Sequence, residues 1–136
     1  MVLAVAASVL IVVGLATWAL LRPHGQQTAR AVIDLRDRSM ARGNEPPPSE
    51  TPLEIPKNVA ALDIYLPLGS GEGSYDVRVI SANGESLLSA TGEAKLDHGL
   101  TILNIDVGPR LSRPGNYIFQ VRRQQSEWGS FALHVR

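Results

Sequence analysis

The chain of 136 residues contains no cysteine, and aromatic residues make up only 5% of it. The lack of cysteine excludes disulfide bridges, thiolate catalysis and cysteine-ligated zinc within this sequence. Acidic and basic residues balance at 13 each, so the overall charge does not favour nucleic acid or another charged polymer as a partner. The length suits one domain of ordinary size and leaves no room for a large enzyme.

Charge is missing altogether from the start of the chain, because no Asp, Glu, Lys or Arg precedes Arg22. As a helix rising about 1.5 Å per residue, the apolar stretch Val2–Leu21 would extend about 30 Å, the thickness of the hydrocarbon core of a bilayer. We therefore predict a transmembrane anchor over residues 1–22. Val2, Leu10 and Leu21 belong to its apolar length, Trp18 suits the headgroup layer, and Arg22 can snorkel beside it.

Two other interpretations of this stretch are weaker. A cleaved secretory signal would have a shorter apolar core and a basic segment before it. A buried soluble helix would need a larger domain to surround it on every face. The orientation of the anchor is predicted from its flanking charges: five arginines follow the stretch and only the α-amine precedes it. The positive-inside rule then puts the C-terminal domain in the cytoplasm, unless the protein begins upstream of Met1 with a cytoplasmic part.

Residues 23–136 show the alternation of β-strands, interrupted by Gly, Pro or Asn about every eight to twelve residues. A proline-rich linker is expected over residues 40–56, where Pro46–Pro48 favour extended polyproline geometry. Asn83-Gly84 predicts a tight hairpin. The strands are expected at residues 31–36, 59–66, 75–79, 86–90, 100–107, 117–122 and 130–136. About seven strands in this length predict an all-β fold, an immunoglobulin-like antiparallel β-sandwich over residues 23–136.

One motif sharpens this fold prediction. Pro114, Gly115 and Tyr117 have the form Pro-Gly-x-Tyr, which resembles the start of strand F in immunoglobulin-like sandwiches. There the tyrosine hydroxyl bonds backbone a few residues upstream and pins the corner, so we predict a structural tyrosine corner at these three residues. Phe119 stands where antibody domains carry a cysteine. The segment Gly73–Val79 repeats the pattern around its own tyrosine.

Residues that could carry chemistry give no recognisable site. His24, His98 and His134 are too widely and irregularly spaced for a local metal site. The glycine-rich segment Gly69–Gly73 lacks the Gly-Lys-Ser/Thr ending of a phosphate loop and leads into a strand. Adjacent pairs such as Asp97-His98 point to opposite faces of a strand and form no nucleophile with its base. We therefore expect no enzyme, no metal, no cofactor and no small-molecule substrate.

The charges cancel in sum but are unevenly distributed along the chain. Residues 22–42 carry five Arg and two Asp, residues 43–107 three bases and ten acids, and residues 108–136 five Arg and one Glu. The first block would lie beside the bilayer, where each basic residue near anionic lipid contributes about 1 kcal/mol. The rest suits solvated strand faces, with an electrostatic docking face for a protein partner as the alternative.

The order of these features resembles the C-terminal half of bacterial transmembrane anti-sigma-factor-like proteins of the zinc-finger type. The stretches that carry the resemblance are the anchor, Ala31–Arg38, Leu62–Gly69, Gly73–Val79 and Pro114–Val121. It implies one membrane span followed by an extracytoplasmic β-sandwich. In that family a cytoplasmic His-x-x-x-Cys-x-x-Cys domain precedes the span. That zinc-binding domain is absent from this sequence, which has no cysteine.

The leading hypothesis is a non-catalytic, single-pass protein of the bacterial inner membrane. Its extracytoplasmic immunoglobulin-like module would bind or sense a protein in the cell envelope, as the membrane and sensor part of an anti-sigma-like regulator. Its partners would be the lipid bilayer and an envelope protein, with no nucleic acid. The alternative is a structural or adhesive envelope protein with no role in transcription. A third arrangement places the module in the cytoplasm.

Overall fold

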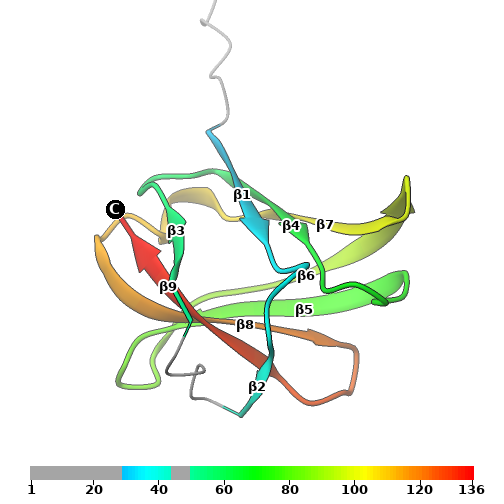
Figure 1. The fold of residues 1–136 in the computed structure, drawn as a ribbon. Coiled ribbons are helices and arrows are strands. Elements are labelled where there is room, and N and C mark those ends of the chain that lie inside the picture. The colour runs from blue at the N-terminus through cyan, green and yellow to red at the C-terminus, as the bar shows by residue number, and fades with distance from the viewer. Residues whose placement is uncertain (1–28, 44–49) are drawn as a thin grey trace, which may run out of the picture.

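The computed structural model describes residues 29–43 and 50–136, and within these ranges it is built of strands (Figure 1). The all-β prediction is confirmed for this part of the chain. One short 3-10 helix, η1 (Gly108–Arg110), lies between two strands. The strands are β1 (Arg30–Asp34), β2 (Ala41–Arg42), β3 (Leu53–Ile55), β4 (Ala61–Tyr65), β5 (Gly73–Ile80), β6 (Ser86–Asp97), β7 (Leu100–Asp106), β8 (Gly115–Arg123) and β9 (Gly129–Val135).

The strands form one mixed sheet in the order β1-β4-β7-β6-β5-β8-β9-β2, with β3 also paired to β9. The prediction of a purely antiparallel fold is wrong at two places, because β1 runs parallel to β4 and β3 runs parallel to β9. The physical reason is the long connection between β1 and β4. This connection contains β2 and β3, which both pair with β9, and it then returns to the end of the sheet where β1 began. Because β4 starts at the same end as β1, the two strands run parallel.

The sheet curls over on itself through the long strand β6. Its first part, Ser86–Ala94, pairs with β5, whereas its last part, Ala94–Asp97, pairs with β7. Gly92 lies where β6 passes from one neighbour to the other. A β-carbon at Gly92 would come within 3.0 Å of the Asn104 carbonyl oxygen and 2.8 Å of the Ile105 side chain. Glycine is therefore needed for the close approach of β6 to β7.

The curl brings β4 and β7 over β5 and β8 and encloses one hydrophobic core (Figure 1). The inner faces expected from alternation are buried, with Tyr117 only half-buried. Phe119 and Phe131 lie at its centre with ring centroids 6.5 Å apart. Alternation within the expected strand ranges assigns one set of residues to the inner face, and the members of that set found buried are Ala31, Ile33, Leu35, Leu62, Ile64, Leu66, Tyr75, Val77, Val79, Leu103, Ile105, Val107, Phe119, Val121, Phe131, Leu133 and Val135.

Two strand ranges differ from the sequence-based expectation. Residues 40–56 contain β2 and β3, and Leu53 and Ile55 of β3 are buried against β9, so this segment is more than a linker. Pro46–Pro48 lie outside the described residues. The expected short strand 86–90 continues to Asp97, because His98 and Gly99 form a tight two-residue hairpin with φ of 49° and 80°.

The two ends of the sheet carry different segments and are called here the loop end and the stem end. The loop end carries the β4–β5 loop (residues 66–72), the β6–β7 hairpin and the β8–β9 hairpin, which lie together on the right of Figure 1. The stem end carries the β5–β6 hairpin, the η1 segment, the C-terminal Arg136 and the start of β1. Since Arg30 pairs with Ala61 at the start of β4, the chain enters the sheet at the stem end.

Candidate binding surface at the loop end

The predicted anchor residues Val2, Leu10, Trp18, Leu21 and Arg22 all lie outside the described residues. Within residues 29–43 and 50–136, no helix has the length and apolar character needed to cross a bilayer.

The second predicted group, Pro114, Gly115 and Tyr117, lies at the stem end where β8 begins. The Tyr117 hydroxyl donates a hydrogen bond to the Arg113 carbonyl, four residues upstream, at 2.9 Å. Gly115 has φ of 153°, which favours glycine, and a β-carbon there would lie 3.6 Å from the Tyr117 ring. The chain therefore turns into β8 with the tyrosine side chain fixed to the turn that precedes it.

A matching arrangement lies at the loop end. The Tyr75 hydroxyl donates to the Gly71 carbonyl, again four residues upstream, at 2.7 Å. Gly73 precedes this tyrosine by two residues, as Gly115 precedes Tyr117, and has φ of 129°. The neighbouring antiparallel strands β5 and β8 thus begin with the same contact at opposite ends of the sheet.

The glycine-rich β4–β5 loop is held by a second side chain, Arg123, from the end of β8. Its guanidinium donates to the Glu72 carbonyl at 2.8 Å. It also covers Gly71, where a β-carbon would lie 2.9 Å from Arg123 Nη1. Arg123 is the register partner of Tyr75 across the β5–β8 pair, which explains how it reaches the loop. The loop is therefore bonded through its backbone from two neighbouring strands.

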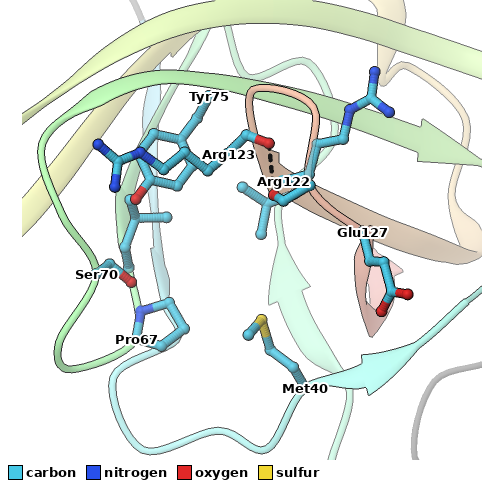
Figure 2. Close-up of a pocket in the computed structure, with 10 residues that line it drawn as sticks. Met40, Pro67, Ser70, Tyr75, Arg122, Arg123 and Glu127 are labelled. Atoms are coloured by element: carbon cyan, nitrogen blue, oxygen red, sulfur yellow. Dashed lines mark hydrogen bonds between the residues drawn. The ribbon is translucent and has the colours of Figure 1, made fainter.

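A cavity of about 180 Å³ opens beside this loop (Figure 2). Tyr75, Ser70 and Pro67 line one side, and Met40, ahead of β2, lies across from them. Glu127 of the β8–β9 hairpin stands at its far rim. The surface that lines the cavity is mostly apolar, with charged side chains on its edge.

A second cavity, of about 150 Å³, lies on the other side of the loop and shares Leu66, Pro67 and Ser70 with the first. Leu68 at the loop tip and Leu96 of β6 line it, and they are 68% and 56% exposed. Met40, 55% exposed, lines the first cavity. Three of the four large hydrophobic side chains exposed in the described residues therefore lie at the loop end, which makes it the candidate interaction surface.

The outer face of β5 and β8 carries a cluster of charged and aromatic groups. The guanidinium carbons of Arg78 and Arg122 lie 4.2 Å and 4.3 Å from the centre of the Trp128 ring. Arg122 also pairs with Asp76 at 3.0 Å. The Thr91 hydroxyl and Arg122 hydrogen-bond the Asp76 carboxylate and lower its pKa below the usual value. This cluster stabilises the hairpin that forms part of the loop end.

The expectation that Asp97 and His98 point to opposite faces is wrong, because His98 lies in the turn after β6 and its Nδ1 contacts the Asp97 carboxylate at 2.5 Å. Both side chains are exposed, and His134 lies elsewhere, where its Nδ1 contacts the Asn116 side chain across the β8–β9 pair. His24 lies outside the described residues. Among residues 29–43 and 50–136, no three His, Asp or Glu side chains are grouped to hold a metal ion. The glycine-rich segment leads into β5, and its backbone is engaged by Tyr75 and Arg123.

Sequence reasoning did not find Arg123, Met40 or Leu96 as parts of this surface. Arg123 could be linked to the loop only with the register of β5 against β8. Leu96 belongs to the part of β6 that was not predicted. Leu68 did carry a signal, since a large apolar residue between Pro67 and a glycine-rich segment cannot reach the core easily. Comparison with family models, with curated proteins and with solved structures finds no match to this chain.

Proposed function

We propose that this chain is a non-catalytic binding module of the bacterial inner membrane, anchored by residues 1–22, whose loop end contacts a protein partner in the cell envelope. One observation carries the proposal. β1 runs parallel to β4, so the chain enters at the stem end, and β4 leads into the loop that bears Leu68. An anchor ahead of Ala29 would hold the stem end near the bilayer and direct the apolar loop end outward.

We further propose that the curled sheet is an immunoglobulin-like sandwich. Three pairings support this: β4 with β7, β5 with β8, and β8 with β9, which match B–E, C–F and F–G of that fold. The strand β6 joins the two halves and β3 lies parallel to β9. The parallel pairing of β1 with β4 departs from an all-antiparallel sandwich.

The proposal has two versions, which differ in what the contact with the partner does. In the first, the module senses an envelope protein as part of an anti-sigma-like regulator, as the resemblance implies. In the second, the exposed apolar loop end serves adhesion within the envelope, a role for which a cluster of exposed Leu and Met side chains is equally suited. An in-frame His-x-x-x-Cys-x-x-Cys segment encoded upstream of Met1 would favour the regulator, and a stop codon there would favour adhesion.

Single-cysteine labelling tests the arrangement, because the chain has no cysteine of its own. Leu68→Cys reports the loop end and Asn83→Cys the stem end, and both positions are exposed. We expect both variants, in intact bacterial spheroplasts, to react with a membrane-impermeant maleimide. After reconstitution into vesicles, a dye at Asn83→Cys should transfer energy to a headgroup dye more efficiently than one at Leu68→Cys. The strand between the two ends, β5, spans about 26 Å.

Leu10→Cys is the matched control, since a position in the middle of the anchor should stay unlabelled in intact spheroplasts. Labelling of Leu68→Cys and Asn83→Cys only after lysis would show a cytoplasmic module and contradict the proposal. Recovery of the full chain in the soluble fraction would contradict the anchor. Equal energy transfer from both positions would contradict the outward direction of the loop end.

A further inference from the structure

The edge of β6 that faces away from β5 is a second feature that the loop-end proposal does not use. Along Ser86–Glu93 this strand pairs with β5 on one side, and among the described residues no strand pairs with it on the other. Pairing with β7 begins only at Ala94. Ser89 and Thr91 are exposed on this stretch. The curl of the sheet at Gly92 thus leaves a strand edge open.

The direction of the backbone groups follows from the alternation of antiparallel pairs. Gln124 donates from its backbone N–H to the Ser74 carbonyl, so even-numbered residues of β5 bond toward β8 and odd-numbered ones toward β6. The odd-numbered residues Tyr75 and Val77 of β5 pair with Gly92 and Ala90 of β6, so these two β6 residues bond toward β5 and their neighbours do not. The N–H and C=O groups of Ser89 and Thr91 therefore point outward. A side chain already uses one of them, since Arg110 donates to the Ser89 carbonyl at 3.4 Å.

Two of the features that usually prevent strand addition are present at this edge only in part. Arg110 reaches the Ser89 carbonyl, and the β5–β6 register shifts between Val79 and Ile80, opposite Ser86–Leu88. Natural proteins also protect edges with charged residues on the strand itself, with proline or with a covering segment. Residues 86–92 contain no charged residue and no proline. Acidic residues stand only at the two ends of the edge, Glu85 before it and Glu93 at its close, and both are exposed. At about 3.3 Å per residue, the backbone from Glu85 to Glu93 would extend at most about 26 Å.

The charges decide which strand can add. If a second copy paired antiparallel with the two-fold axis at Ser89, Glu85 of one copy would come near Glu93 of the other, because each is four residues from Ser89 and only the irregularity at Ser86–Leu88 shifts the register between them. Like charges directly across two strands are destabilising. The two Arg110 side chains would also meet near the axis. A strand with a basic residue at each end would instead place a cation beside each carboxylate.

We propose that the β6 edge binds an extended peptide segment of another protein by strand addition, with small or β-branched residues in the middle and a basic residue at each end. Backbone hydrogen bonds to the Ser89 N–H and to the N–H and C=O groups of Thr91 provide the affinity. Glu85 and Glu93 select the charge pattern. This inference does not depend on the membrane anchor or on the loop end.

The probe is a nine-residue peptide with lysine at both ends and alternating threonine and valine between them, and the comparison peptide has glutamate at both ends. Both are titrated by calorimetry into the full chain in detergent solution. We expect the lysine peptide to bind about tenfold more tightly, since two favourable pairs replace two repulsive ones. Amide hydrogen exchange should slow at Ser89 and Thr91 and stay unchanged in the loop 66–72.

Two variants test the edge directly. Ser89→Pro removes an outward N–H that the β5–β6 pair does not use, and should weaken binding about tenfold, whereas its matched control Ser89→Ala keeps the N–H and should bind normally. The double variant Glu85→Lys with Glu93→Lys should reverse the preference in favour of the glutamate peptide. That reversal does not depend on Ser89→Pro folding well.

The inference is overturned if neither peptide binds at millimolar concentration, or if both bind equally to the original chain. Protection of Ser89 and Thr91 that rises with protein concentration and without peptide would show that a second copy occupies the edge. Slowed exchange only in the loop 66–72 would place the peptide at the loop end instead.

Discussion

The two ends of the sheet begin neighbouring strands with the same contact but are made rigid in different ways. At the stem end Tyr117 is half-buried and bonds the carbonyl of Arg113, next to Pro114, so part of the stiffness resides in the chain itself. At the loop end Tyr75 is only 6% exposed and bonds a glycine in a loop with several glycines. The backbone of that loop is therefore held in place by hydrogen bonds from the side chains of Tyr75 and Arg123.

The glycine content of the loop explains why a second side chain, Arg123, bonds to its backbone. A loop with several glycines loses more conformational entropy on ordering than one that contains proline. At the loop end the Arg123 side chain adds a bond to the Glu72 carbonyl, whereas the stem-end segment before β8 is held by a backbone bond from the Asn58 N–H to the Leu111 carbonyl. The loop end can therefore present Leu68 on an ordered backbone without burying it in the core.

Removing both tyrosine side chains in turn gives the largest expected contrast. Tyr75→Ala should cost about 3–5 kcal/mol of unfolding free energy, the usual loss for a buried aromatic. Tyr117→Ala should cost about 1–2 kcal/mol, because its ring is half-exposed. Urea unfolding of the full chain in detergent solution measures both. Equal losses of unfolding free energy in the two variants would show that Tyr75 and Tyr117 stabilise the fold to the same extent, which would contradict the difference between the two ends.

Replacing the glycine before each tyrosine tests the backbone rather than the ring. Gly73→Ala and Gly115→Ala should each cost about 1–3 kcal/mol, because φ of 129° and 153° strains any residue with a β-carbon. Neither new β-carbon meets an atom closer than 3.5 Å, so strain is the main cost. Gly71→Ala is the control: its φ is ordinary, and the new β-carbon displaces only the flexible Arg123 side chain.

A much smaller loss at Gly73 than at Gly115, by the same urea unfolding, would show that the loop end relaxes around the strain. That result would contradict an ordered loop. A loss at Gly71 as large as that at Gly73 would mean that displacing Arg123 matters as much as backbone strain.

Much of the fold could be predicted because alternation reports which face of a strand is buried. Leu62, Ile64 and Leu66 needed no knowledge of any partner strand to be assigned to the core. The Gly-x-Tyr pattern at residues 73–75 and 115–117 likewise depends only on local geometry, so both tyrosines could be singled out from the sequence.

What could not be predicted depends on register and on distant partners. Leu53–Ile55 is too short to show a period, and only pairing with β9 makes it a strand. The parallel arrangement of β1 and β4 follows from the path of the intervening chain. Arg123 joins the loop end only because it lies opposite Tyr75, and Gly92 matters only because β7 passes close to it.

The smallest expected difference between the two ends is in how their stability depends on pH, because a titrating residue follows the tyrosine only at the loop end. The residue after Tyr75 is Asp76, whereas the residue after Tyr117 is Ile118, which does not titrate. Hydrogen bonds from Thr91 and Arg122 hold the pKa of Asp76 below its usual value. Its contribution to stability is therefore complete above about pH 3.9, the usual value for the unfolded chain, and is lost as the pH falls through the lower folded pKa.

Asp76→Asn should accordingly lower the unfolding free energy by about 0.5–1 kcal/mol at pH 7, and the gap from the original chain should close as the pH falls below 4. Urea unfolding at several pH values measures the gap. Asp34→Asn is the comparison, since Arg36 lowers the pKa of Asp34 from only two residues away. That local pair can persist in the unfolded chain, so its loss should change stability less. A gap for Asp76→Asn that stays constant with pH would mean that the carboxylate charge does not support the loop end.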